Sequence, residues 1–502
     1  MARTLSRLRH LIAADCAIPI WLSLLAFGLT TMGQSGDSLK PIPAISQPPG
    51  GASCHECLII RVGLPRIVGG PVPNLFDNTF SEIMLPNGRF RGYTASATTY
   101  AVDAAHPWSM DGKLIPVLRP GAPGDVDSCG QWIQHAELFG SVVFALVHDE
   151  TGCKTNQGRK SMSLATSNDY GITWNNAGLI LTAPDTAAYG RTTGEGDCTA
   201  VDGGDGFWYA YCKRPGSYAT VVARAPLSNP TPGQWKHFFQ GEWSEPGLGG
   251  QATPLKGVSN SAARWKTTGE TILLGGVPGG MGLYFSTDHT TFTHLPAPIF
   301  PQDRGSWKRP DPTELISYPV LIDANDGSNQ LGLSWYLVYM YVQPNETMGQ
   351  RYLVFRPINV SISSQPVTPQ SGILLARWYN PKLVDRWSTT AAVPGNYKSY
   401  QLDGKQGYLM TAADPSKPSV ALEDCASQAS GRPEHLLEEK RFCTGDYQRL
   451  RTAGWVYMQP QENTVPLYGC YNAAEHSHFA SNRPDCEQLG TQERLLGYAL
   501  SQ

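Results

Sequence analysis

The sequence predicts an all-β protein in which a β-propeller is followed by a β-trefoil. Glycine and aromatic residues are abundant, with 52 Gly, 13 Trp and 22 Tyr, which fits many short strands joined by tight turns. Short apolar runs separated by turn residues fill the first two thirds of the chain. The last third repeats itself three times. A chain of 502 residues is also long enough for two or more domains.

The N-terminus has the pattern of an export signal. Three arginines within the first nine residues precede an apolar run over residues 17–29. This run is shorter than the roughly 20 apolar residues of a membrane-spanning helix, so we predict a signal peptide at 1–33. The cleavage zone lacks a clean Ala-x-Ala, which leaves an uncleaved anchor open. Residues 34–57, rich in Pro, Ser and Gly, are predicted to be a flexible leader. We expect a secreted or periplasmic protein with no membrane span once the signal is removed.

The cysteine count agrees with export. Cys16 lies in the signal, and ten of the eleven cysteines remain, an even number suited to an oxidising compartment. Cys198 and Cys212 flank a hairpin with a Gly-rich turn, so a bridge between them is expected. Cys54 and Cys57 have the spacing of a metal-binding pair. No second pair follows at zinc-finger spacing, and disulfides are therefore favoured.

Residues 58–368 are predicted to form the propeller. β-type runs recur at 141–148, 206–212, 271–275 and 335–341, each bounded by turn residues. The length of this segment suits five blades, with six as the alternative.

The motif Ser167-Asn-Asp-Tyr-Gly-Ile-Thr-Trp174 matches the Asp-box pattern S-x-D-x-G-x-[ST]-W. In such a hairpin the carboxylate of Asp169 accepts backbone N–H groups, Gly171 takes a positive φ and Trp174 packs between strands. A degraded copy lies at 286–292. The motif predicts a fold and carries no chemistry of its own.

Four stretches resemble secreted bacterial propellers of the sialidase-like and arabinanase-like, Asp-box glycoside hydrolase type. They are residues 148–153, 160–162, 194–197 and 243–250. The resemblance implies action on polysaccharides, with one acid on each of several neighbouring blades. A sialidase proper would in addition need three converging arginines. Arg191, Arg264 and Arg309 are available, but none lies in a local signature, so exo-sialidase activity is kept as an alternative.

Residues 373–502 contain the threefold repeat. The glycines that close the repeats, Gly407, Gly454 and Gly497, are 47 and 43 residues apart. Three such units do not close a propeller, but they do close a β-trefoil. The third repeat resembles small modules appended to secreted bacterial hydrolases. The resemblance leaves two roles open, a carbohydrate-binding domain and a purely structural appendage.

Two further disulfides follow from the repeat alignment. Cys425 with Cys443, and Cys470 with Cys486, occupy equivalent places in the second and third repeats. The first repeat has Trp378 where the others have their first cysteine, so no bridge is expected there.

Glycoside hydrolysis requires two carboxyl groups that flank the scissile bond. Glu150 closes a predicted strand, and Asp197 enters the next one from a Gly-flanked turn, so these are the catalytic candidates. Asp77 is a third candidate on the first blade. Glu195 is nearly as well placed as Asp197, and the sequence does not separate them. Each acid also has a structural alternative, such as capping a turn.

Several polar and aromatic side chains are candidates for sugar binding. The set comprises Trp132, His135, His148, Arg191, Glu195, Arg309 and Asp311, with Trp208 and Trp307 as further stacking faces. Tryptophans of a propeller also fill gaps between blades, and a lone histidine is often only hydrogen-bonded.

The sequence therefore predicts a secreted glycoside hydrolase that cleaves a poly- or oligosaccharide. The alternative is a carbohydrate-binding protein without catalysis. A net charge of −3 with 16% charged residues is not the basic composition typical of nucleic-acid-binding proteins. No cofactor and no metal ligand is expected, a structural calcium ion stays open, and we expect a monomer. The sugar, its linkage and the stereochemical outcome are not determined by the sequence.

Overall fold

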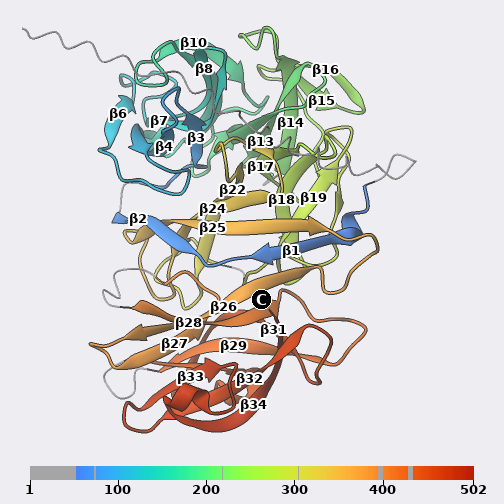
Figure 1. Cartoon of the computed structure of the whole chain (residues 1–502). Helices are drawn as coiled ribbons and strands as arrows, with labels where there is room; N and C mark the ends of the chain where they lie inside the picture. Colours follow the sequence, from blue (N-terminus) through green and yellow to red (C-terminus); the bar gives the residue numbers. More distant parts are fainter. Residues whose placement is uncertain are drawn as a thin grey trace, which may run out of the picture. The chain divides into compact units, whose positions relative to one another are not determined.

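The computed structural model describes residues 53–72, 75–217, 219–303, 305–393, 400–427 and 433–501. The predicted signal peptide and most of the predicted leader lie outside these residues. In the described residues, β-strands alternate with turns, and the helical elements are four short 3-10 turns (Figure 1). These are η1 (His55–Cys57), η2 (Cys153–Thr155), η3 (Lys440–Phe442) and η4 (Cys486–Gln488).

Four separate sheets follow one another along the chain, antiparallel except for the parallel pairs β9–β11 and β17–β23. The first contains β3 (Ser81–Met84), β4 (Phe90–Ser96), β5 (Thr98–Ala104) and β6 (Ile115–Leu118). The second contains β7 (Gly130–Phe139), β8 (Val142–Thr151), β9 (Arg159–Ser167) and β10 (Asn175–Leu181), with β11 (Thr193–Gly194) at its side. The third contains β12 (Gly196–Asp202), β13 (Phe207–Arg214), β14 (Ala219–Pro226), β15 (Lys236–Phe239) and β16 (Glu242–Pro246). The fourth contains β17 (Val258–Trp265), β18 (Thr271–Val277), β19 (Gly280–Ser286), β20 (Thr293–His294), β21 (Phe300–Pro301) and β23 (Gln330–Leu331).

The sheets are arranged as the blades of a β-propeller. In each, consecutive strands pair as a meander, and the first strands β3, β7, β12 and β17 lie next to one another in chain order. The series continues with β22 (Leu315–Asp323), which lies beside β17 and pairs with β24 (Ser334–Val342); β24 pairs in turn with β25 (Arg351–Ile362). First strands that converge on one axis bring residues from distant parts of the sequence together.

The first strands of the described chain are paired with a strand near the end of the predicted propeller. β1 (Leu58–Val62) pairs antiparallel with β25, and β2 (Arg66–Val72) pairs with the other half of β25 (Figure 1). The ring of His55 stacks on Phe285 at 4.0 Å, and its Nε2 lies 2.9 Å from a carboxylate oxygen of Glu270. Residues 53–57 are therefore not part of a flexible leader, which corrects the boundary expected from composition.

The C-terminal part shows the repeat that the sequence predicted as three equivalent sets of strands. They are β26 (Ser371–Asn380), β27 (Asp385–Thr389) and β28 (Gln401–Met410), then β29 (Ser419–Ser427), β30 (Glu434–Glu439) and β31 (Gln448–Tyr457), then β32 (Thr464–Asn472), β33 (Ser477–Ser481) and β34 (Thr491–Leu500). The last strands of the sets, β28, β31 and β34, also pair with one another. Gly407, Gly454 and Gly497 all have positive φ, because each lies at the same kink of its strand.

β1 also pairs in parallel with β26. The strands β22, β24 and β25 therefore belong, together with β1, β2 and the C-terminal strands, to one continuous 14-stranded sheet. A buried ion pair adds to this connection, because Arg451 Nη1 lies 2.9 Å from Glu314 Oε2. Both side chains are only 3% exposed.

In the hairpin at residues 167–174, side-chain oxygens of Ser167 and Asp169 accept backbone N–H groups of the turn. Asp169 accepts the N–H groups of Ile172 and Thr173 at 3.1 and 2.9 Å. Gly171 has a φ of 84°, and Trp174 packs edge-to-face on Tyr93.

Five disulfides are present in the described residues. Cys198–Cys212, Cys425–Cys443 and Cys470–Cys486 are the three pairs that the sequence predicted. The other two are Cys54–Cys57 and Cys129–Cys153. Cys54 and Cys57 are thus bound to each other.

Candidate active site

A cleft of about 1010 Å³ lies where the starts of several first strands meet. Its lining combines charged, polar and aromatic side chains from blades that are far apart in sequence. They include Glu150 of β8, Lys160 of β9, Asp197 of β12, Lys213 and Arg214 of β13, Asn260 of β17, Tyr318 of β22, and Arg191 and Trp307 from loops.

The position of Asp197 depends on its glycine neighbour and on adjacent blades. A Cβ on Gly196 would lie 2.5 Å from Nδ1 of His148, so only glycine allows this approach. The backbone of Asp197 has a positive φ of 52°, and its N–H donates to His148 Nδ1 at 2.8 Å. The side-chain amide of Asn260 donates to the Asp197 carbonyl oxygen.

Glu150 and Asp197 share two neighbours. Lys160 Nζ lies 2.6 Å from Asp197 Oδ2 and 3.5 Å from Glu150 Oε1. Because His148 Nδ1 accepts an N–H, its Nε2 carries the proton and donates to Glu150 Oε1 at 3.0 Å. The two predicted carboxylates are therefore brought together on either side of the His148 imidazole.

Both carboxylates are ionised at neutral pH. Burial opposes the ionisation of Asp197, but its interactions with His148 and Lys160 outweigh burial and the pKa of Asp197 is lowered. Burial likewise opposes ionisation of Glu150, and the His148 hydrogen bond together with Lys160 lowers its pKa. The pKa of Lys160 is raised, since its burial is outweighed by the two carboxylates. The three charges stabilise one another.

Asp77 lies behind one wall of the cleft. Its Oδ1 accepts the Tyr318 hydroxyl at 3.2 Å and lies 3.0 Å from Nη1 of Arg351. Asp77 is absent from the lining of the cleft, whereas Tyr318 belongs to it. Burial, with the charges of Asp77 and Asp197, raises the pKa of Tyr318 well above its usual range.

Glu195 does not lie in the cleft. Its side chain is fully buried, with Arg214 Nε 2.7 Å away and His237 Nε2 2.9 Å away. Glu195 precedes Asp197 by only two residues, but its side chain points into the blade. The geometry therefore separates the two acids that the sequence left equivalent.

Trp132 and the loop residues Arg309 and Asp311 do not line the cleft either, contrary to the sequence prediction. Trp132 is 8% exposed and packs edge-on against the ring of His148. The Arg309 guanidinium is buried and donates to the carbonyl oxygens of Glu346, Thr313 and Gln343, while Asp311 accepts the Thr313 N–H. These groups stabilise their own surroundings.

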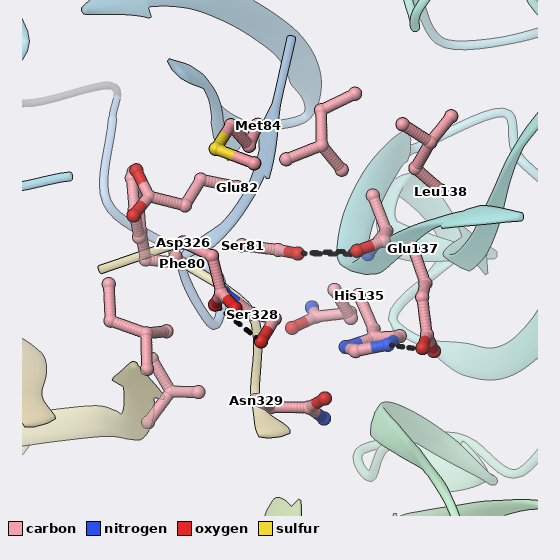
Figure 2. A pocket seen from close by; sticks show the side chains of 16 residues that line it. Phe80, Ser81, Glu82, Met84, His135, Glu137, Leu138, Asp326, Ser328 and Asn329 are labelled. Atoms are coloured by element: carbon pink, nitrogen blue, oxygen red, sulfur yellow. Dashed lines mark hydrogen bonds and ion pairs between the residues drawn. The ribbon is translucent and has the colours of Figure 1, made fainter. Parts of the chain in front are cut away.

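His135 lies in a second, smaller pocket of about 230 Å³ (Figure 2). Its Nε2 lies 3.5 Å from Glu137, and the pocket also contains Glu82 and Asp326. This pocket is lined by the later residues of β3, β7 and β22, whereas the cleft is lined by the start of β12, β17 and β22. His135 is therefore separate from the Glu150–Asp197 pair.

The three arginines considered for a sialidase do not converge. Arg191 lines the cleft, Arg309 is bound to carbonyl oxygens, and Arg264 donates to the Gly269 carbonyl at 3.3 Å. A site for a sialic acid carboxylate built from these three is thus absent from the described residues, so exo-sialidase activity is not proposed.

Sequence reasoning missed several residues of the cleft, among them Lys160, Lys213, Arg214, Asn260 and Tyr318. Lys160 lies in one of the stretches that carry the family resemblance, but no role was assigned to it. Of the tryptophans, Trp307 is 50% exposed and lines the cleft, whereas Trp208 is fully buried in the core.

No family model and no curated protein matches the chain in sequence. Among solved structures, it is similar to a thermostable family-43 glycoside hydrolase, with 13% identity, 61% of this chain and 99% of the other covered, and a TM-score of 0.39. It is also similar to Zg3597, a family 117 glycoside hydrolase from Zobellia galactanivorans. The identity is 10%, 65% of this chain and 97% of the other are covered, and the TM-score is 0.42. A GH43_1 enzyme from Xanthomonas citri is 11% identical, with 61% of this chain and 96% of the other covered and a TM-score of 0.36. Because these scores are low, we base the proposed function on the cleft.

Two kinds of feature are absent from the described residues. They contain no helix with the length and apolar character needed to cross a membrane. Within the same residues, no group of three or more histidine, cysteine or acidic side chains is arranged to bind a metal ion.

Proposed function

We propose that the protein is a secreted glycoside hydrolase that cleaves a poly- or oligosaccharide in the cleft. The observation that carries the proposal is the pairing of Glu150 and Asp197, which face one cavity and share Lys160. A pair of carboxylates at the surface of a large cleft is the minimum machinery of glycoside hydrolysis.

The short distance between the two groups favours the retaining mechanism. Two oxygens at 2.6 and 3.5 Å from one ammonium nitrogen are at most about 6 Å apart, which is below the ~6.5–9.5 Å spacing of inverting enzymes. Asp197, held ionised by Lys160, would attack the anomeric carbon. A bound sugar removes water from Glu150, whose side chain is 29% exposed, and burial raises the pKa of a carboxyl group. Glu150 would then take up a proton from solvent and donate it to the leaving oxygen. A water molecule, deprotonated by Glu150, would afterwards displace the sugar from its ester with Asp197 and restore both carboxyl groups.

The test is product release from a panel of plant, bacterial and algal polysaccharides. Wild type, Glu150→Gln and Asp197→Asn are compared, with Glu242→Gln as a control because Glu242 is exposed on β16. We expect each cleft variant to lose a factor of about 10² or more in rate, while the control stays active. Cleavage that survives in both cleft variants would refute the assignment. The anomer first released, measured by NMR, tests the retaining outcome.

A non-catalytic carbohydrate-binding protein is the second candidate. The observation that favours it is that Lys160 and His148 keep both carboxylates ionised in the free protein, so neither acid carries a proton to donate. This candidate predicts glycan binding that survives Asp197→Asn and no products on any polysaccharide.

We also propose the finer architecture and location. β22, β24, β25 and β2 would form a fifth blade, because β22 continues the series of first strands. Residues 373–502 would be a β-trefoil, supported by the three matching sets of strands. Five disulfides are typical of an oxidising compartment, which agrees with a signal peptide at 1–33 and a secreted or periplasmic monomer.

A further inference from the structure

We infer that the cleft binds an acidic sugar, whose anionic group pairs with Lys213 and Arg191. The inference names the substrate class of the same site and rests on the proposed function. The anionic group is the carboxylate of a uronic acid or a sulfate ester, since the same two cations would bind either.

The charges that line the cleft do not balance. Four cationic side chains, Lys160, Arg191, Lys213 and Arg214, accompany the two carboxylates Glu150 and Asp197. Lys160 is held between both carboxylates. Arg214 is bound to the buried Glu195 and to a carbonyl oxygen. Two cations are left without a carboxylate partner.

Lys213 is one of these two cations. Its ammonium donates to the Thr220 hydroxyl at 2.7 Å and to the Val258 carbonyl at 3.4 Å, both neutral groups. No carboxylate lies within 4.0 Å of it in the part of the chain that the structure describes. Burial lowers its pKa to about 8, although the more distant charge of Asp197 acts in the opposite direction. An anion bound in the cleft would supply that compensation.

Arg191 is the second cation. It is exposed at the cleft, and among the described residues its guanidinium has no hydrogen bond or ion pair. A guanidinium binds a carboxylate or sulfate through two parallel hydrogen bonds, which a sugar hydroxyl does not offer. The half-exposed ring of Trp307, also in the lining, offers a face on which a sugar ring stacks. Together these groups suit a pyranose with a negative charge better than a neutral one.

The experiment compares binding of acidic and neutral forms of the same glycans by calorimetry. The mature chain is titrated with oligogalacturonate, alginate and hyaluronan oligosaccharides and their carboxyl-reduced forms, and with sulfated galactans and their desulfated forms. Lys213→Met and Arg191→Gln are measured beside Lys236→Met, a control at an exposed lysine of β15. A difference between the uronate and sulfate arms identifies the source of the anionic group.

We expect at least one acidic glycan to bind, and its neutral form to bind at least tenfold more weakly. Lys213→Met and Arg191→Gln should each weaken binding of the acidic form about tenfold and leave the neutral form unchanged. The inference is overturned if no acidic glycan binds, if neutral forms bind equally well, or if Lys213→Met weakens both forms equally. Its failure is distinct from that of the proposed function. Cleavage of neutral glycans only would refute this inference, whereas binding of acidic glycans without cleavage would refute the hydrolase.

Discussion

Replacing Lys213 by methionine should stabilise the fold while it weakens binding. Burial lowers the pKa of the Lys213 ammonium from its ordinary 10.5 to about 8. Since one pKa unit corresponds to about 1.4 kcal/mol, the charged lysine costs the folded state roughly 3 kcal/mol at neutral pH. Methionine has a similar length and no charge, but it forfeits the hydrogen bond to Thr220, worth about 1 kcal/mol. The variant should therefore be more stable by about 1–2 kcal/mol at pH 7.

The stability difference between the wild type and Lys213→Met should depend on pH. Below pH 8 the lysine is charged in both the folded and the unfolded state, so the full cost applies to the wild type. Between about pH 8 and 10.5 the folded state is already neutral while the unfolded state still binds the proton, and the wild type gains stability as pH rises. The advantage of the variant should shrink over this range.

The assay is thermal unfolding of the wild type, Lys213→Met and the control Lys236→Met at pH 7 and pH 9.5. We expect Lys213→Met to unfold about 1–3 °C higher at pH 7, with a smaller difference at pH 9.5. The control should show neither effect, because Lys236 is exposed. A variant that is less stable than the wild type at both pH values would mean that the Lys213 charge is already compensated.

Two further predictions concern an aromatic side chain and a turn. Trp307→Ala should weaken binding of the best glycan in the panel roughly tenfold by calorimetry, because stacking on its half-exposed ring is lost, and should leave the melting temperature unchanged. An unchanged affinity would exclude the ring from the sugar site. Asp169→Ala removes the acceptor of two turn N–H groups and should cost about 1 kcal/mol in the free energy of unfolding by denaturant titration. Asn168→Ala in the same turn is the control, and equal losses in both variants would refute the role given to the carboxylate.

Local patterns were sufficient to predict much of the fold. The all-β class, the propeller arrangement and the threefold repeat follow from short apolar runs and regularly spaced glycines. The pairing of β1 with both β25 and β26 was missed, because strand pairing between distant segments leaves no periodic signal in either segment. The end of the leader was misjudged for a similar reason. His55 is held in place by Phe285 and Glu270, more than 200 residues away.

Some residues of the candidate cleft were recognised from the sequence and others were missed, and the difference between them has a physical cause. Glu150 and Asp197 were recognisable because each acid stands at the edge of a strand beside glycine or turn residues. Lys213 and Tyr318 were missed because nothing local to either marks it. Their role depends on which blades meet at the axis. Glu195 shows the converse limit. Residues two apart in a regular strand share a face, but here the pairing is irregular after Gly196 and Asp197 has a positive φ, so Glu195 and Asp197 have different surroundings.

The strained backbone of Asp197 bears on whether this acid is functional or merely caps a turn. A turn-capping aspartate accepts backbone N–H groups with its carboxylate, as Asp169 does. The Asp197 carboxylate instead contacts the side chains of Lys160 and Gln134, both on the neighbouring blade. Its positive φ is held by His148 from that blade and by Asn260 from the next. A costly conformation kept by contacts from two blades, with the carboxylate facing a cleft, is typical of functional sites. The same contacts explain why Asp197→Asn is expected to lose activity in the polysaccharide panel without unfolding. Asp197→Asn keeps the backbone contacts and loses only the charge, so it should remove chemistry while the fold remains.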